Sequence, residues 1–291
     1  MKFPSNRLDD TIKVFKNHLK DLYPENEINS FLYLSLNKLF GFSKIDLFVN
    51  RNQTINESDL LKINSIIKEL KLFKPIQYIL GSTVFMDCIL NVNSSVLIPR
   101  PETEELVQWI FNENKGAKDL KILDIATGSG CIAIALKKQI QRASVYGLDI
   151  SFEAIETAKE NAIMNDTQIN FCLNDITSNE NIFEESFFDI IVSNPPYVLE
   201  GEKEMMHPNV LNFEPHIALF VPNENPLYFY ESILQKGMIW LKPGGKLYVE
   251  MNPTQSKTLG LHFGQLNYTS IVNKEDLHGK IRFYKGEKPL I

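Results

Sequence analysis

The residues best suited to hold a flat polar group are Asn194-Pro195-Pro196-Tyr197. They follow the apolar, β-branched run Phe188–Val192, which predicts a buried strand. The Asn amide can accept at its oxygen and donate two hydrogen bonds from its nitrogen. Each proline fixes φ and lacks an N–H, so the pair predicts a stiff corner whose carbonyl groups are free to accept. Tyr adds a flat face with a polar tip, and ligands of open α/β sheets bind where strands end in this way.

The simplest alternative is a proline-rich turn that only leaves a strand, and for a lone Pro-Pro-Tyr segment that alternative is favoured. The preceding strand and Asn194 favour a functional motif. Together they match the (Asn/Asp/Ser)-Pro-Pro-(Tyr/Phe) signature of methyltransferases that act on amino groups conjugated to a planar π system. The motif therefore resembles the substrate corner of such an enzyme.

A second candidate site is the turn Ala126-Thr127-Gly128-Ser129-Gly130, which follows a predicted strand. Glycines let the backbone approach a ligand closely, and a helix N-terminus offers free N–H groups. The spacing differs from the G-x-G-x-x-G dinucleotide pattern. Strand-to-helix turns often contain glycine, so the turn alone is a weak signal.

Three carboxylates strengthen the signal because each stands at or near the end of a predicted strand. Asp124 lies two residues ahead of the glycine turn. Asp149 ends the next strand, where a carboxylate can accept both ribose hydroxyls. Asp175, with Ile176 beside it, suits the edge and the face of an adenine ring. Asp175 is almost equally compatible with an N-cap or a turn.

The elements that position these residues begin with a predicted helical domain at residues 1–75. Apolar residues recur every three or four positions in three segments, which end near Pro24, at Gly41 and near Pro75. Taken singly, each of these apolar residues is a core residue, and together they predict a small helical bundle. The three stripes are Leu8, Ile12, Phe15, Leu19 and Leu22; Ile28, Phe31, Leu32, Leu36, Leu39 and Phe40; and Leu60, Leu61, Ile63, Ile66, Ile67 and Leu70.

Residues 76–98 are predicted to be a β-hairpin linker, because the apolar period shifts towards two in Val84-Phe85 and in Ile89–Val92. The next segment can start a helix at Pro101 or Thr103 with carboxylates in its first turn. Its Arg100 and Glu102 are equally compatible with a surface ion pair and with a corner beside a bound cofactor.

Residues 99–291 alternate between strands and helices, which predicts an α/β domain with a parallel sheet covered on both faces. The last two strands have a short connection and predict an antiparallel addition at one edge. The predicted strands are Lys121–Ile125, Ser144–Leu148, Ile169–Leu173, Phe188–Val192, Gly245–Met251, 267–273 and 280–285, and the predicted helices are Gly130–Gln139, Phe152–Met164, Leu227–Leu241 and Thr254–Phe263.

Composition narrows the function classes. The chain has 291 residues, of which 44% are hydrophobic and 23% charged, and a net charge of −6. This balance argues against bare nucleic acid as the main partner. The chain has three cysteines, Cys88, Cys131 and Cys172, and their spacing is not that of metal ligands, so we expect no metal site. Because an odd number does not suggest a disulfide framework, we expect a reducing compartment, the cytoplasm. No apolar run is long enough to span a membrane, so we expect no membrane partner. We also expect a monomer.

The chain as a whole resembles the peptide chain release factor glutamine methyltransferases (the PrmC/HemK family). The resemblance rests on Lys74–Gly81 (Lys-Pro-Ile-Gln-Tyr-Ile-Leu-Gly), Leu97–Glu104 (Leu-Ile-Pro-Arg-Pro-Glu-Thr-Glu), the glycine turn, Ser193–Tyr197 and Asp276–Arg282. It implies a Rossmann-like class I S-adenosylmethionine-dependent methyltransferase domain at 99–291, behind the helical bundle and the hairpin linker. The implied reaction methylates the side-chain amide of the Gln in the Gly-Gly-Gln loop of class I release factors.

The resemblance implies roles for residues at both sites. The substrate amide pocket would be Asn194, Pro195, Pro196 and Tyr197, with Asn194, Pro195 and Tyr197 catalytic. The cofactor residues would be Asp124, Ala126, Thr127, Gly128, Ser129, Gly130, Asp149, Asp175, Ile176 and Asn194. The family usually has Gly at position 126, so a positive φ there would strain the Ala by about 1 kcal/mol or more. It often has an aromatic residue at position 176, where Ile offers aliphatic contact instead.

The mechanism implied is an amide clamp. The Asn194 side-chain oxygen and the Pro195 carbonyl would each accept one N–H of the substrate Gln, and Tyr197 would pack against the amide. Two alternatives stay open: a nucleic-acid adenine-N6 methyltransferase, which uses the same corner on a flipped base, and a non-catalytic interaction module of the same fold. A basic recognition domain would favour the first, and loss of cofactor binding would favour the second.

Overall fold

The computed structural model describes residues 3–290 and divides them into two compact units. The first unit is the chain up to Gly81 together with the short segment His207–Phe213. The second is Ser82–Met206 together with the chain from Glu214 onward. The functional division into a recognition domain, a linker and a catalytic domain, with boundaries at residues 75 and 98, remains a prediction.

The first unit is helical, as its apolar periodicity predicts. Buried side chains from three long helices form its core, among them Phe15, Leu36 and Ile67. The hydroxyl of Tyr23 donates to the carbonyl of Leu70 at 2.7 Å and satisfies one of the last carbonyl groups of a helix. The helices of this unit are α1 (Leu8–Leu19), α2 (Glu25–Phe40), α3 (Asp46–Val49), α4 (Glu57–Leu70), α5 (Ile76–Leu80) and α9 (Pro208–Leu211).

The first part of the predicted hairpin linker is wrong, because Ile76–Leu80 is helix α5. Pro75 precedes the helix in an extended conformation, and Gly81 ends it with φ 71°. A five-residue helix is too short to show a helical period, and Ile76 is buried in the core of the first unit. The hairpin itself is confirmed over β1 (Ser82–Phe85) and β2 (Cys88–Asn91), which pair antiparallel.

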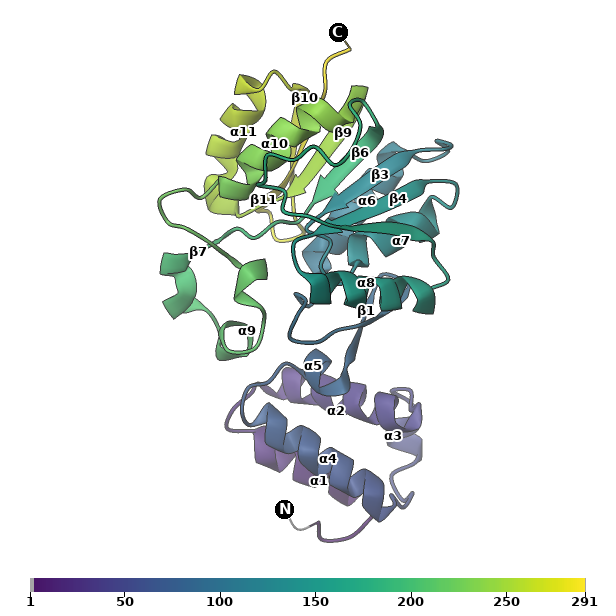
Figure 1. The fold of residues 1–291 in the computed structure, drawn as a ribbon. Helices are drawn as coiled ribbons and strands as arrows, with labels where there is room; N and C mark the ends of the chain where they lie inside the picture. Colours follow the sequence, from purple (N-terminus) through teal and green to yellow (C-terminus); the bar gives the residue numbers. More distant parts are fainter. Residues whose placement is uncertain (1–2, 291) are drawn as a thin grey trace. The chain divides into compact units, whose positions relative to one another are not determined.

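The second unit is built on a seven-stranded sheet with the order β10-β11-β9-β6-β3-β4-β5 (Figure 1). Five adjacent strands run parallel, while β11 pairs antiparallel with β9 and with β10. This confirms the predicted mixed α/β sheet with its antiparallel edge. The strands are β3 (Lys121–Ile125), β4 (Ser144–Asp149), β5 (Ile169–Leu173), β6 (Phe188–Ser193), β9 (Leu241–Glu250), β10 (Thr269–Glu275) and β11 (Ile281–Glu287).

Helices cover both faces of this sheet (Figure 1). Successive residues of a strand point to opposite faces, so Ile190 packs in one core cluster and Ile191 in the other. The first cluster includes side chains of α6 (Pro101–Glu113), α7 (Cys131–Gln139) and α8 (Phe152–Met164). The second includes side chains of α10 (Tyr228–Trp240) and α11 (Ser256–Gln265).

The chain between β6 and α10 was not assigned from the sequence. It contains the short parallel pair β7 (Val198–Leu199) and β8 (Phe220–Val221), separated by two 3-10 turns and α9. The 3-10 turns are η1 (Glu200–Met205) and η2 (His216–Ala218), and a third, η3 (Pro253–Gln255), precedes α11. Within residues 3–290 no helix has the length and apolarity needed to cross a membrane.

The sheet order places the candidate residues together. After β3 the chain adds β4 and β5 on one side and then returns to place β6 on the other, so the order reverses between β3 and β6. Ile125 of β3 and Ser193 of β6 are register partners, and the Ser193 hydroxyl donates to the Ile125 carbonyl at 2.7 Å. The glycine turn and Asn194 therefore leave the sheet side by side, at the point where open α/β sheets bind ligands.

Candidate active site

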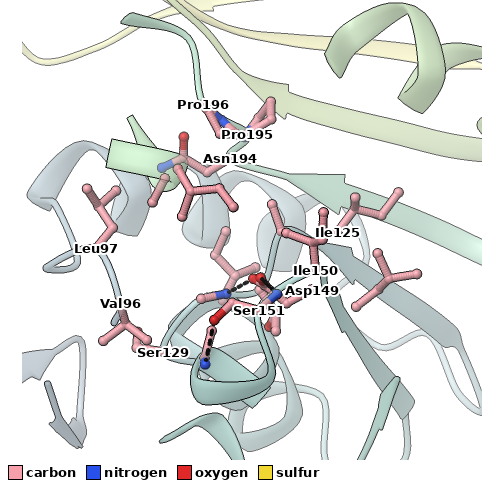
Figure 2. A pocket seen from close by; sticks show the side chains of 18 of the residues that line it. Val96, Leu97, Ile125, Ser129, Asp149, Ile150, Ser151, Asn194, Pro195 and Pro196 are labelled. Atoms are coloured by element: carbon pink, nitrogen blue, oxygen red, sulfur yellow. Dashed lines mark hydrogen bonds between the residues drawn. The ribbon is translucent and has the colours of Figure 1, made fainter. Parts of the chain in front are cut away.

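A cavity in the second unit opens at the carboxyl ends of β3, β4 and β6. Asn194, Pro195 and Pro196 lie at one end of it, and Asp149 lies with Ser151 near the other (Figure 2). Ten predicted site residues line it: Ala126, Thr127, Gly128, Ser129, Asp149, Asp175, Ile176, Asn194, Pro195 and Pro196. The structure therefore brings the two candidate sites into one cavity.

The glycine turn presents bare backbone to this cavity. Gly128 has φ 54°, and a Cβ placed there would meet no atom within 4 Å. The turn is held from behind, because the Thr127 N–H donates to the Leu148 carbonyl at 3.0 Å. A ligand can thus approach the main chain at Gly128 as closely as the predicted cofactor contact requires.

Asp149 ties the turn to the second strand. One carboxylate oxygen accepts from the Gly128 N–H at 2.8 Å and the other from the Ser151 N–H at 3.0 Å. Burial raises the pKa of Asp149, while these backbone donors favour its ionised form. An ionised carboxylate has about four acceptor sites, so each oxygen can still accept one hydroxyl group from a ligand.

Asp175 fits both interpretations that its sequence position allows. One of its oxygens accepts from the Thr177 N–H at 2.8 Å and from the Thr177 hydroxyl at 2.7 Å, as in a turn. The residue also lines the cavity, and the neighbouring Ile176 is 7% exposed. Ile150 also lines the cavity, and the two isoleucines offer apolar surface to a flat ring.

Three predicted site residues do not line the cavity. Asp124 is fully buried behind the turn, where one oxygen accepts from the Thr127 hydroxyl at 2.6 Å. Burial raises its pKa to about 7. Gly130 has φ 79°, and a Cβ there would come within 3.2 Å of Ala158, so this glycine serves helix packing. Tyr197 points its hydroxyl at the carboxylate of Glu250.

Ala126 has a positive φ of 58°, so its backbone is strained as expected for a non-glycine residue in this conformation. The left-handed region costs a non-glycine residue about 1–2 kcal/mol. The other residues of the turn with positive φ are both glycines, Gly128 and Gly130. The backbone at Ala126 therefore has a conformation that glycine adopts without strain, and the Cβ of Ala126 is the source of the strain.

We expect Ala126→Gly to raise the free energy of unfolding by about 1 kcal/mol, because it removes this strain. Thermal melts without ligand measure the effect. Ala117 is an exposed loop residue whose φ is not positive, and Ala117→Gly should lower stability by about 0.4–1 kcal/mol. A lower melting temperature for Ala126→Gly, in parallel with Ala117→Gly, would contradict the strain.

At the other end of the cavity, the Asn194 side chain is held through its nitrogen. That nitrogen donates to the Thr103 hydroxyl at 3.1 Å. The Thr103 hydroxyl in turn donates to Glu250 at 2.8 Å, and the Tyr197 hydroxyl donates to the other oxygen of Glu250 at 3.1 Å. Thr103 was predicted only as a possible helix start, and Glu250 was not predicted as a site residue.

Glu250 is the last residue of β9 and is 1% exposed. Burial raises its pKa to about 7, whereas the donors Thr103 and Tyr197 and the positive charge of Arg282 favour the carboxylate. Burial also raises the pKa of the Tyr197 hydroxyl well above its ordinary value, so Tyr197 stays a donor. Two hydroxyl donors aimed at one carboxyl group match an acceptor-only carboxylate.

Further residues line the cavity outside the predicted set of site residues. They include Ser95, Val96, Ser151, Asn174 and Phe229, which belong to no recognised motif, and Leu97, which begins the Leu97–Glu104 run. Arg100 lines the cavity, as the corner beside a cofactor requires, but its ion pair is with Glu214 at 2.6 Å rather than with Glu102. Glu214 also accepts from the Ile98 N–H at 3.2 Å.

No group of three or more potential metal ligands occurs among residues 3–290. None of the five histidines lines the cavity. The chemistry available in the cavity is therefore hydrogen bonding from Asn194, from backbone groups and from carboxylates, in a mostly apolar surrounding.

Known proteins share both units. A family model described as the PrmC N-terminal domain matches residues 10–81, and one described as the methyltransferase small domain matches 102–211. The chain is 42% identical over 274 residues to a release factor glutamine methyltransferase of Flavobacterium psychrophilum, covering 93% of this chain and 95% of the relative. It is 40% identical over 270 residues to the enzyme of the same description from Bacteroides thetaiotaomicron, covering 93% and 96%.

Among solved structures, a methyltransferase from Pyrococcus furiosus superposes with a TM-score of 0.52 at 18% identity, over 71% of this chain and 91% of the other. At that identity the likeness shows the fold alone, and it agrees with the α/β sheet of the second unit.

Proposed function

The chain belongs to the release factor glutamine methyltransferases, and we propose that it transfers a methyl group from S-adenosylmethionine to the side-chain amide nitrogen of a Gln in the Gly-Gly-Gln loop of class I release factors. The observation that carries this proposal is the position of Asn194-Pro195-Pro196 in the same cavity as the glycine turn. An amide acceptor corner thus faces the place where a methyl donor can lie.

The residues present fit the methyl donor. Open backbone at Gly128 and the remaining acceptor sites of Asp149 suit its ribose, and Ile150 with Ile176 suits the faces of its adenine ring. When bound, S-adenosylmethionine supplies an electrophilic methyl group on a sulfonium centre. The predicted contacts of Asp124 and Gly130 are indirect, since both residues support the turn from behind.

The substrate amide needs help because its nitrogen lone pair is delocalised into the carbonyl. Asn194 Oδ1 and the Pro195 carbonyl each accept one N–H of the Gln. These two bonds orient the nitrogen and favour the positive charge that develops on it during in-line transfer. Pro196 keeps the corner stiff. No base has to act before transfer, since the N–H becomes acidic only once the new N–C bond has formed. The bond between the methyl group and sulfur breaks as the N–C bond forms, and the released proton then passes to water.

The remaining parts of the proposal concern the partner. The helical unit recognises the body of the release factor, while the cavity acts on one loop residue. The enzyme works as a monomer in the cytoplasm. It has no nucleic-acid partner, which is consistent with its net charge of −6. A Gly-Gly-Gln loop suits a narrow corner, because the residues before the Gln have no side chains to clash.

We expect Asp149→Ala to weaken S-adenosylmethionine binding about tenfold or more, because each charge-assisted bond is worth about 1.5–3 kcal/mol. Isothermal titration calorimetry measures the affinity. Asp149→Asn keeps one acceptor oxygen, so it should weaken S-adenosylmethionine binding less than Asp149→Ala does. Asp87→Ala removes an exposed carboxylate and should leave the affinity unchanged. Wild-type affinity in Asp149→Ala would mean that the cofactor lies elsewhere.

The reaction class is tested by offering two substrates in one assay with isotopically labelled S-adenosylmethionine. We expect label in an intact class I release factor and none in DNA that contains adenine. Label in DNA alone would favour the adenine-N6 alternative. Absence of cofactor binding by calorimetry would favour a non-catalytic module.

A further inference from the structure

Asn194 can serve as an acceptor only if its amide faces the cavity with oxygen rather than nitrogen. The two ends of an amide have nearly the same shape but opposite hydrogen-bonding character. If the nitrogen faced the substrate, its N–H groups would oppose the N–H groups of the Gln amide. The function proposed above therefore requires something that selects one of the two orientations.

The selection begins at Glu250. Its carboxyl group is buried at the end of β9, and its ionised form, which the Thr103 and Tyr197 donors and the charge of Arg282 favour, can only accept hydrogen bonds. It accepts from Thr103 at 2.8 Å and from Tyr197 at 3.1 Å. Each of the two hydroxyl groups must then donate its single proton to Glu250.

Thr103 links Glu250 to Asn194 and thereby determines which end of the Asn194 amide faces it. The residue is 2% exposed, and its hydroxyl donates to Glu250 at 2.8 Å. Only lone pairs remain for its other neighbour, so that neighbour must be a donor. The neighbour is Asn194 Nδ2, at 3.1 Å. An Asn194 oxygen in this place would face another acceptor, which costs the free energy of an unmade buried hydrogen bond.

We propose that Glu250 and Thr103 are positioning residues that fix the amide orientation of Asn194, so that its oxygen faces the substrate. This inference rests on the proposed function. Glu250 does not line the cavity, and Thr103, which lines it beside Asn194, acts on the substrate amide only through Asn194. They connect α6, β9 and the end of β6, three elements far apart in the sequence, so the orientation is set by the fold and not by the loop itself.

The test uses the full chain, an intact release factor and three isosteric or conservative variants. Thr103→Val removes the lone pairs, and kcat should fall about tenfold or more while the calorimetric affinity for S-adenosylmethionine stays within about twofold. Thr103→Ser restores the hydroxyl and should recover kcat to within about threefold of wild type. Glu250→Gln offers one acceptor and one donor, so the Thr103 proton is no longer committed, and kcat should also fall.

Thr167→Val is the matched control. It removes a half-buried hydroxyl that donates to the Ala162 carbonyl at 3.1 Å, away from the cavity, and kcat should not change. Wild-type kcat in Thr103→Val, or a Thr103→Ser variant as slow as Thr103→Val, would overturn the inference. So would a loss of cofactor affinity that matches the loss of kcat.

If Thr103→Val does not fold, as shown by its melting curve, the comparison of Thr103→Ser with Glu250→Gln decides the question. A Glu250→Gln variant as fast as wild type would then overturn it. Failure of the proposed function looks different, because wild-type enzyme would itself transfer no methyl group to the release factor.

Discussion

Replacing Asn194 by Ala is expected to lower methyl transfer by about a hundredfold to a thousandfold, on an intact release factor and on a Gly-Gly-Gln peptide alike. The substitution removes one of the two acceptors that orient the substrate amide and that face the charge developing on its nitrogen. Because both substrates present the same amide to the same corner, the factors should be equal. Initial rates at saturating S-adenosylmethionine measure the effect.

The control for this variant is Asn112→Ala, which removes an exposed amide on α6 that lies outside the cavity. It should keep wild-type rates on both substrates. Calorimetry should show that Asn194→Ala still binds S-adenosylmethionine, although more weakly if Asn194 also contacts the cofactor as predicted. An Asn194→Ala enzyme with more than about a tenth of the wild-type rate would contradict the amide clamp.

Removing the helical unit is expected to lower kcat/KM far more for the intact release factor than for the peptide. Contacts remote from the reacting group supply binding energy that positions that group, and a peptide lacks them from the start. A loss of about a hundredfold on the release factor, against about threefold on the peptide, corresponds to about 2 kcal/mol of remote contacts.

The structure changes where the deletion should be made. Ile76 is buried in the core of the first unit and Gly81 ends α5, so the cut belongs after Gly81 rather than after residue 75. Because His207–Phe213 also belongs to that unit, cofactor affinity and the melting curve of the truncated chain must be measured beside the rates. Equal losses on both substrates would show that the unit supports the fold and does not recognise the partner.

The sheet was predictable because its strands are short apolar runs separated by glycine turns and amphipathic helices. The runs at Lys121–Ile125 and Ile169–Leu173 match β3 and β5 in both bounds. The alternation along the chain then implies a shared edge for the strand ends, and this placed Asp149 and Asn194 in one cavity. Local pattern and global fold agree in this part of the chain.

The rest depended on contacts that a local pattern does not contain. The five-residue helix α5 spans little more than one turn of about 3.6 residues, so no apolar repeat can show in it. The bond between Thr103 and Glu250 joins residues 147 positions apart. One signal for it was present in the sequence: Glu250 directly follows Leu247-Tyr248-Val249, and a carboxylate at the end of an apolar strand needs a buried partner.

Locating the added methyl group decides whether the enzyme modifies the Gly-Gly-Gln loop. A class I release factor is incubated with the enzyme and S-adenosylmethionine, digested, and analysed by fragmentation mass spectrometry. We expect a single added methyl group on the side chain of the Gln in the Gly-Gly-Gln loop, absent when the Asn194→Ala enzyme is used. A methyl group on another residue, or an unmodified loop after incubation with enzyme that binds the cofactor, would contradict this expectation.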